Sequence, residues 1–163
     1  MGETMSRYAA WDIETARSLI AQLASLPGAT LPILHALQEE FGYIDKAAVK
    51  LIAEALNLSQ AEIHGVTSFY HDFRDAPPSG RVIKLCRAEA CQALGCEDLV
   101  SHASQQHGVT ADAPSPQAHV LIETVYCLGN CALGPSALVE GELIGRLDAA
   151  RLSELCRGAA VSA

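Results

Sequence analysis

The sequence predicts an α+β protein in which an N-terminal helical bundle is followed by a small domain with the order β-α-β-β-β-α. Three observations predict this fold class. The first seventy residues repeat apolar side chains at helical spacing between capping residues and glycines. A stretch rich in proline and glycine follows at 74–80. Beyond it, short apolar runs of strand length accompany helical patterns. We therefore expect two domains, residues 1–75 and residues 76–163.

Four helices are expected in the first domain, and short polar residues mark where they start. Asp, Ser and Thr are favoured at helix N-termini because their side chains accept hydrogen bonds from the first free backbone N–H groups. Asp12, Asp45 and Ser59 are in these positions, and the second helix is expected to start near Thr30 and Pro32. Ser59 with Glu62 fits a reciprocal capping box. Gly42 is placed to end the second helix.

The second domain reads as a small sheet with helices. Residues 81–86 form an apolar run that suits a buried strand, and a helical pattern extends from Cys91 to about Gly108. A second strand is expected at 119–125. Two short strands flank Gly141 and Glu142 as a hairpin, and Asp148 is placed to cap the last helix. This order of elements is that of a thioredoxin-like domain.

Composition and charge exclude several classes of function. Half of the 163 residues are apolar, so the chain can bury a core. The formal charge is −8 without any run of basic residues, which argues against a nucleic-acid partner. No apolar stretch approaches the roughly 18 residues of a membrane span, and residues 1–10 do not resemble a secretion signal. We expect a soluble, cytoplasmic protein with no membrane insertion.

Four of the six cysteines form two short-spaced pairs. The pattern is Cys86-x4-Cys91 and, 35 residues later, Cys127-x3-Cys131. Each pair lies just past a predicted strand, and the carboxyl ends of parallel neighbouring strands meet at one edge of a sheet. Four thiolates are what a [2Fe–2S] cluster requires, two for each iron. The glycines near the second pair also allow backbone N–H groups to approach a bound anion.

Other interpretations of these cysteines remain open. A structural Zn(Cys)4 site would use the same four sulfurs, although zinc sites favour two-residue gaps within a pair. A dithiol oxidoreductase would normally carry Cys-x-x-Cys, which does not occur here. A plant-type ferredoxin spacing matches only in its first gap. Cys96 would lie about 140° from Cys91 around one continuous helix, so we interpret Cys96 and Cys156 as buried apolar residues.

Two further groups of residues are candidates for a site. The six histidines show no facing His-x3-His pair and are interpreted as surface or structural residues. Phe69, Tyr70 and Phe73 lie just before the predicted linker, and we favour core packing over an exposed docking patch for them. No glycine-rich nucleotide-binding motif is present, so we do not expect this chain to bind NAD or to be catalytic alone.

Three segments resemble the thioredoxin-like [2Fe–2S] ferredoxin family, which includes the 24-kDa subunit of complex I and its relatives in NAD-reducing hydrogenases and NAD-dependent formate dehydrogenases. The resemblance covers residues 31–44, residues 65–73 and the two cysteine pairs. Ala88, Glu89 and Ala90 stand where complex I members usually carry Gly-Thr-Ala. With the loop at 127–135, they look more like the gamma subunit of a soluble, molybdenum-containing formate dehydrogenase.

The resemblance implies a cofactor and partners. It implies one [2Fe–2S] cluster, with iron bound by Cys86, Cys91, Cys127 and Cys131. It also implies an FMN- and NAD-binding subunit of the same complex, with which the cluster would exchange single electrons. It further implies an iron–sulfur and molybdenum catalytic subunit as a second partner. By this resemblance the chain is a non-catalytic electron-transfer subunit.

Overall fold

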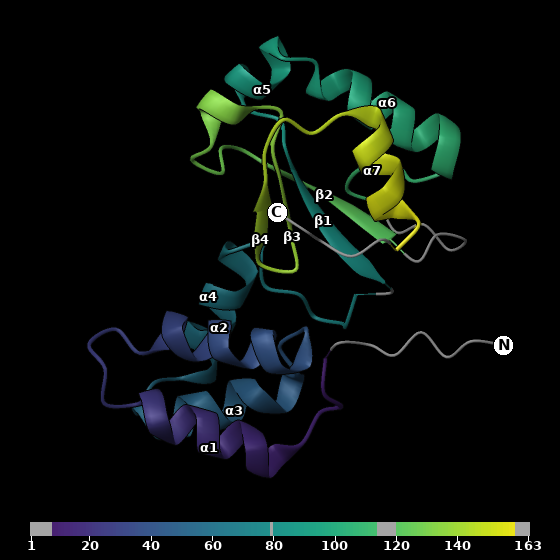
Figure 1. The fold of residues 1–163 in the computed structure, drawn as a ribbon. Coiled ribbons are helices and arrows are strands. Elements are labelled where there is room, and N and C mark those ends of the chain that lie inside the picture. The colour runs from purple at the N-terminus through teal and green to yellow at the C-terminus, as the bar shows by residue number, and fades with distance from the viewer. Residues whose placement is uncertain (1–7, 79, 114–119, 159–163) are drawn as a thin grey trace, which may run out of the picture. The chain divides into compact units, whose positions relative to one another are not determined.

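The computed structural model describes residues 8–78, 80–113 and 120–158 (Figure 1). The chain divides into two compact units, Met1–Pro78 and Ser79–Ala163. The division therefore falls inside the stretch rich in proline and glycine. Each unit has its own apolar core, and each is described by itself below.

The first unit contains four helices with short connections. They are α1 (Ile13–Leu23), α2 (Thr30–Phe41), α3 (Lys46–Leu56) and α4 (Gln60–Phe69). Their apolar faces meet in one core, whose largest fully buried side chains are Ile33, Leu34, Leu37, Phe41, Ile52 and Ile63. The predicted helical bundle is confirmed.

Three predicted N-caps are confirmed, whereas α2 starts at Thr30 after Ala29, which makes no side-chain cap hydrogen bond. The side chain of Asp12 accepts a hydrogen bond from the N–H of Thr15 at 2.8 Å. Asp45 caps α3 in the same way, and Ser59 and Glu62 form the complete reciprocal capping box of α4. Gly42 ends α2 in the left-handed conformation, with φ +81°. These contacts satisfy backbone groups that a helix end leaves without partners.

A buried amide ties the segment after α4 back onto α2. Gln38 is only 9% exposed; its Nε2 donates to the carbonyl of Asp72 at 2.7 Å, and its Oε1 accepts from the N–H of Arg74 at 2.7 Å. Phe73, between these two residues, is buried in the helical core. The expectation of core packing therefore holds for Phe73. It is wrong for Phe69 and Tyr70, which are 73% and 44% exposed.

The second unit is a four-stranded sheet in the order β2-β1-β3-β4. The strands are β1 (Arg81–Cys86), β2 (Val120–Val125), β3 (Ala137–Val139) and β4 (Glu142–Ile144). β1 and β2 are parallel, and the other two pairings are antiparallel. Alternate residues of β1, β2 and β3 share one core with the helices α6 (Cys96–His107) and α7 (Ala149–Cys156), which lie beside each other in Figure 1. The mixed sheet agrees with the predicted thioredoxin-like domain.

Two local expectations need correction. The helical pattern after Cys91 is not one helix, because α5 (Glu89–Ala93) ends and α6 starts again after Gly95, which adopts φ +91°. The hairpin between β3 and β4 turns at Glu140 and Gly141, one residue earlier than expected. Both turn residues have positive φ, which matches the twist of a two-residue hairpin. The predicted strand start at His119 lies outside the described residues.

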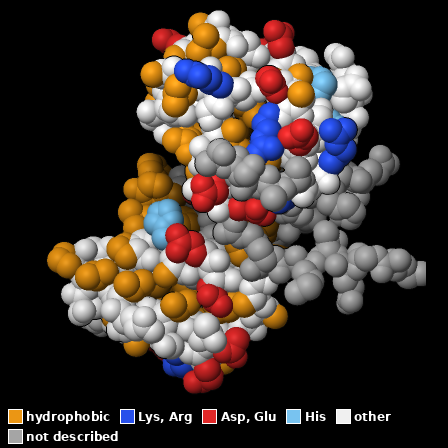
Figure 2. All heavy atoms as spheres, viewed as in Figure 1, with side chains coloured by type: hydrophobic (Ala, Val, Ile, Leu, Met, Phe, Trp, Pro, Cys, Tyr) orange, Lys and Arg blue, Asp and Glu red, His pale blue; other side chains and the backbone are white. Residues whose placement is uncertain are grey.

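On the face shown in Figure 2, acidic and basic side chains are interspersed over the sheet unit, whereas the helical unit shows mainly acidic ones. Among the described residues on that face, lysine and arginine side chains stand between acidic and apolar ones. No helix in the described part of the chain is long and apolar enough to cross a membrane.

The helical unit generates a paired glycine prediction. A Cβ atom at Gly42 would lie 2.7 Å from two ring atoms of Tyr8, on a backbone with positive φ. Gly42→Ala should therefore lower the free energy of unfolding by more than about 1 kcal/mol. Gly65 lies inside α4, where an added Cβ would meet no atom within 4 Å, so Gly65→Ala should raise it by up to about 1 kcal/mol. Urea denaturation followed by circular dichroism measures both; equal effects of the same sign would contradict the assigned backbone conformations.

Candidate functional site

The first cysteine pair lies at the carboxyl end of β1. Cys86 is the last residue of this strand and Cys91 lies in α5, and each is only 2% exposed. The backbone N–H of Cys86 donates to the carbonyl of Ser136 at 3.0 Å, and that of Arg87 donates to Val125 at 2.9 Å. Both cysteines are therefore held by the sheet and by the helix that follows it.

The second pair lies on the loop after β2, and both of its cysteines are exposed. Cys127 and Gly129 adopt positive φ, +78° and +77°. This curls the loop so that Cys131, at the start of the short 3-10 helix η1 (Cys131–Leu133), returns to Cys127. The two Sγ atoms are 3.7 Å apart, and the N–H of Gly129 donates to Cys127 Sγ at 3.4 Å.

The parallel strands bring the two pairs together. Cys86 stands opposite Val125 in the β1–β2 register, so the loop that carries Cys127 begins beside it. The backbone N–H groups of Cys127 and Leu128 donate to the thiol of Cys86, and the N–H of Ser136 donates to that of Cys91. Cys131 in turn interacts electrostatically with both Cys86 and Cys91. The structure thus brings all four predicted residues to one edge of the sheet.

Neighbouring thiols affect the ionisation of Cys86, Cys91 and Cys131. Burial raises the pKa of Cys86, but N–H donors from Ala88, Cys127 and Leu128 and a hydrogen bond with Cys91 outweigh it and lower the pKa overall. The pKa of Cys91 is raised, first by burial and then by Cys86. The pKa of Cys131 is raised, first by its hydrogen bond with Cys127. Four thiolates in one place repel each other, which disfavours the ionisation of all four. A bound cation offsets this repulsion and so stabilises the four ionised sulfurs.

Ser136 fastens the loop of the second pair to the sheet. This serine is only 1% exposed, and its hydroxyl accepts a hydrogen bond from Asn130 Nδ2 at 3.2 Å and lies 3.4 Å from the carbonyl oxygens of Asn130 and Leu133. Its own backbone carbonyl and N–H contact Cys86 and Cys91, as described above. Sequence analysis missed this residue, because nothing in a lone serine beside a proline signals such a role.

Gly134 is required by close packing beside the thiols. A Cβ atom at this position would lie 2.9 Å from Leu94 Cδ1 and 3.3 Å from Cys91 Sγ. A side chain here would displace the exposed end of Leu94 and press on the thiol of Cys91. The sequence analysis expected the glycines of this loop to provide conformational freedom. In the structure, Gly134 is needed because there is little room for a side chain at this position.

Cys96 lies near the four thiols, although it belongs to another helix. It is fully buried and packs in one cluster with Cys86 and Cys91. Burial, followed by the charge of Glu97, raises its pKa to about 11. The 140° separation of Cys91 and Cys96 was calculated for one continuous helix. It does not apply here, because α5 and α6 are separate helices. Cys156 packs at the edge of the sheet core.

Arg87, directly after Cys86, is held in an ion pair. Its Nε and Nη2 donate to the two carboxylate oxygens of Glu97 at 2.8 and 2.7 Å. Both side chains are partly exposed, so we assign this pair little stabilising energy. The pair joins the end of β1 to the first turn of α6.

The donor set fits an iron–sulfur cluster. Within the described residues, no three His, Cys, Asp or Glu side chains are arranged to hold a single metal ion. A [2Fe–2S] core is larger: each iron takes two thiolates and sulfides bridge the irons, so the four sulfurs need not surround one point. The two converging pairs match that requirement, with N–H donors to sulfur at Cys86, Cys91 and Cys127.

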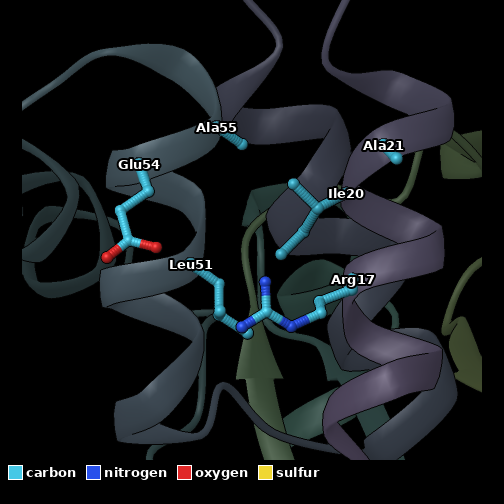
Figure 3. Close-up of a pocket in the computed structure, with 6 residues that line it drawn as sticks. All are labelled: Arg17, Ile20, Ala21, Leu51, Glu54 and Ala55. Carbon is cyan, nitrogen blue, oxygen red and sulfur yellow. The ribbon is translucent and has the colours of Figure 1, made fainter.

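A shallow groove in the helical unit shows no comparable chemistry. It lies between α1 and α3, and Figure 3 shows Arg17 reaching from α1 toward Leu51 on α3, next to Ile20. Its lining residues are Arg17, Ile20, Ala21, Leu51, Glu54 and Ala55. No cysteine or histidine is among them.

The fold and the clustered thiols define a small α+β protein with a cysteine-rich centre at the edge of a thioredoxin-like sheet. The chain belongs to the thioredoxin-like [2Fe–2S] ferredoxin family, whose model matches residues 16–160. Proteins of this family bind one [2Fe–2S] cluster. The predicted family and cofactor are therefore confirmed.

Known relatives of the chain are subunits of larger enzymes. The chain is 27% identical over 142 residues to the NADP-reducing hydrogenase subunit HndA of Solidesulfovibrio fructosivorans, covering 85% of this chain and 83% of that protein. It is 29% identical over 127 residues to a subunit of the NADH-quinone oxidoreductase of Rhizobium meliloti, covering 78% and 76%. It is 28% identical over 131 residues to NADH-quinone oxidoreductase subunit 2 of Thermus thermophilus, covering 80% and 72%.

A solved structure shares the fold. The crystal structure of an NAD+-reducing [NiFe]-hydrogenase in the air-oxidized state matches with a TM-score of 0.68 and 27% identity. The match covers 82% of this chain but only 23% of the hydrogenase chain. The chain thus corresponds to less than a quarter of that polypeptide.

Ser136 generates a stability prediction. Ser136→Ala removes the hydroxyl that Asn130 Nδ2 bonds and should lower the free energy of unfolding of the second unit by about 1 kcal/mol. Ser104→Ala, at an exposed position of α6, is the matched control and should change it by less than about 0.5 kcal/mol. Denaturation of the full chain followed by circular dichroism tests both, and an unchanged midpoint for Ser136→Ala would show that the hydroxyl does not fasten the loop.

Proposed function

We propose that this chain is an electron-transfer subunit of a multisubunit NAD-linked oxidoreductase, holding one [2Fe–2S] cluster on Cys86, Cys91, Cys127 and Cys131. The observation that carries the proposal is the convergence of four thiols from the ends of two parallel strands. The names of its relatives support it, because they are subunits of hydrogenases and NADH-quinone oxidoreductases.

The two cysteine pairs have different tasks. When bound, the cluster supplies one-electron redox chemistry. Cys86 and Cys91 would hold the cluster on the buried side of the site and keep water from it, because both are buried. Cys127 and Cys131 lie at the surface, so this side of the site is open to an electron donor or acceptor. The N–H groups of Ala88, Cys127 and Leu128 stabilise negative charge on the sulfur of Cys86.

The proposed partner is an FMN- and NAD-binding subunit of the same complex. A flavin can take up a hydride as two electrons and release them singly, so it needs a neighbouring one-electron carrier. The chain itself carries no glycine-rich nucleotide-binding motif, which agrees with such a division of labour.

For the parent complex, we propose a soluble NAD-dependent formate dehydrogenase, in which this chain is the gamma subunit beside a molybdenum-containing catalytic subunit. Support comes from Ala88, Glu89 and Ala90 before the second cysteine and from the loop at 127–135. The alternative parent complex is an NAD-reducing hydrogenase or complex I. The names of the relatives favour this alternative.

The ligand set predicts the outcome of single cysteine replacements. Replacing Cys86, Cys91, Cys127 or Cys131 with Ser should abolish or distort the S = 1/2 EPR signal of the reduced protein, because a ligand sulfur is lost. Cys156→Ser is the control and should keep the signal, with about two irons and two sulfides per chain. If all four variants kept an unchanged spectrum, the ligand set would be wrong. One zinc and no iron in anaerobically prepared protein would favour a Zn(Cys)4 assembly module.

The formate dehydrogenase proposal predicts that an active enzyme co-purifies with the chain. The tagged chain, isolated anaerobically from its native host, should bring down a flavoprotein and a molybdenum subunit that together reduce NAD+ with formate. Activity assays with formate and with hydrogen, together with mass spectrometry of the large subunit, distinguish the alternatives. Hydrogen-dependent reduction, or a membrane-embedded quinone reductase, would contradict the formate dehydrogenase assignment.

A further inference from the structure

An ion pair lies beside the thiols, between the end of β1 and the start of α6. Arg87 directly follows Cys86, and its backbone N–H donates to the carbonyl of Val125 at the end of β2. The side chain of Arg87 is held by Glu97 in the first turn of α6. The two carboxylate oxygens of Glu97 accept from Nε and Nη2 at 2.8 and 2.7 Å. One positive and one negative charge are therefore fixed close to the strand ends that carry the cysteine pairs.

Cys96 connects this ion pair to the thiols. Its Sγ lies 3.9 Å from Glu97 Oε1, the same oxygen that accepts from Arg87 Nε. Cys96 also packs in one cluster with Cys86 and Cys91. The thiol of Cys96 interacts electrostatically with both members of the ion pair and with both of these cysteines. The two charges therefore lie close to two of the four proposed ligands.

The ion pair is better suited to adjusting the charge of the site than to stabilising the fold. The side chains of Arg87 and Glu97 are 28% and 48% exposed, and ion pairs with this exposure contribute little to stability. Two parallel charge-assisted hydrogen bonds nevertheless fix the guanidinium in one position. The side-chain hydrogen bonds from Arg87 also lower the pKa of Glu97, so its carboxylate remains ionised. The pair thus provides a fixed cation whose charge is cancelled by a neighbouring anion.

A fixed charge beside an iron–sulfur cluster changes how readily the cluster is reduced. Reduction adds one electron, and therefore one negative charge, to the site, and net charge is one of the factors that set the reduction potential. A nearby cation favours the reduced form and a nearby anion disfavours it. Arg87 alone would therefore raise the potential, whereas Glu97 opposes this effect.

We propose that Glu97 is a positioning residue that lowers the reduction potential of the [2Fe–2S] cluster by holding and neutralising the guanidinium of Arg87. This rests on the proposed function, because it requires a cluster on the four cysteines. One electron enters the site and one leaves it, and no bond or proton changes at Glu97 or Arg87. A lower potential makes the reduced site a stronger electron donor to the next carrier.

The test is an anaerobic redox titration of the full-length, cluster-loaded chain, followed by the EPR signal of the reduced form. In Glu97→Gln, an anion is lost and the Arg87 cation is left unneutralised. At the midpoint potential of the unaltered chain, the ratio of reduced to oxidised protein should rise by about threefold or more. This corresponds to an upward shift of about 28 mV, at about 59 mV per tenfold change for one electron.

The opposite charge change should shift the potential in the opposite direction. Arg87→Gln leaves the Glu97 carboxylate without its cation, so the midpoint should fall. The double variant lacks both charges, so its midpoint should lie between those of the two single variants. A purely structural role of the pair does not predict shifts of opposite sign. The integrated EPR signal of each variant checks that its cluster is intact.

Glu154→Gln is the matched control. Glu154 also accepts from an arginine, Arg151, at 2.9 Å, but it lies on α7. The neighbouring Ser153 hydroxyl lies 2.8 and 2.9 Å from Nε2 of His102 and His107, which are in the later turns of α6. This control therefore removes a paired carboxylate of the same unit away from the first turn of α6, and it should leave the midpoint unchanged.

The possible outcomes separate this inference from the proposed function. Midpoints of both single variants that equal the control, or that shift in the same direction, would overturn the role of Glu97 and leave the cluster assignment standing. An unaltered chain that takes up no iron–sulfur cluster would overturn both. If Glu97→Gln takes up no cluster, Arg87→Gln decides alone, because its midpoint must fall.

Discussion

The parallel pairing of β1 with β2 is the constraint on which the rest of the second unit depends. Backbone hydrogen bonds align Cys86 with Val125, so the chain leaves both strands at the same edge of the sheet. Two cysteine pairs separated by 35 residues in the sequence meet there for that reason. A shift of this register by one residue would turn Cys86 to the opposite face of the sheet and separate the pairs.

Around that edge, the cysteine sulfur atoms are held in place mainly by backbone groups. Left-handed residues at Cys127 and Gly129 curl the second loop, and Ser136 fastens it to the sheet. The N–H groups that this arrangement directs at Cys86 offset the cost of burying a thiolate. The same loop leaves Cys127 and Cys131 exposed. One side of the site is thereby insulated and the other is accessible, as electron exchange requires.

In both units, residues at the helix ends determine where the next segment of the chain lies. In the helical unit, Asp12, Asp45 and Ser59 satisfy free N–H groups, and Gln38 anchors the segment that follows α4. In the sheet unit, a turn at Leu94 and Gly95 separates α5 from α6. That break directs Cys96 into the apolar cluster beside Cys86, in a position that no helical periodicity describes.

The sequence by itself determined the four helices of the first unit, most of their caps, the four strands and the two cysteine pairs at strand ends, because these features depend on periodicity and on short-range hydrogen bonds. It also determined which family the chain resembles. Only the tertiary structure decided the roles of Ser136, Cys96 and the His102–Ser153–His107 contact. Each of these is set by residues distant in the sequence, and the positions depend on how the strands and helices pack, which no local pattern records.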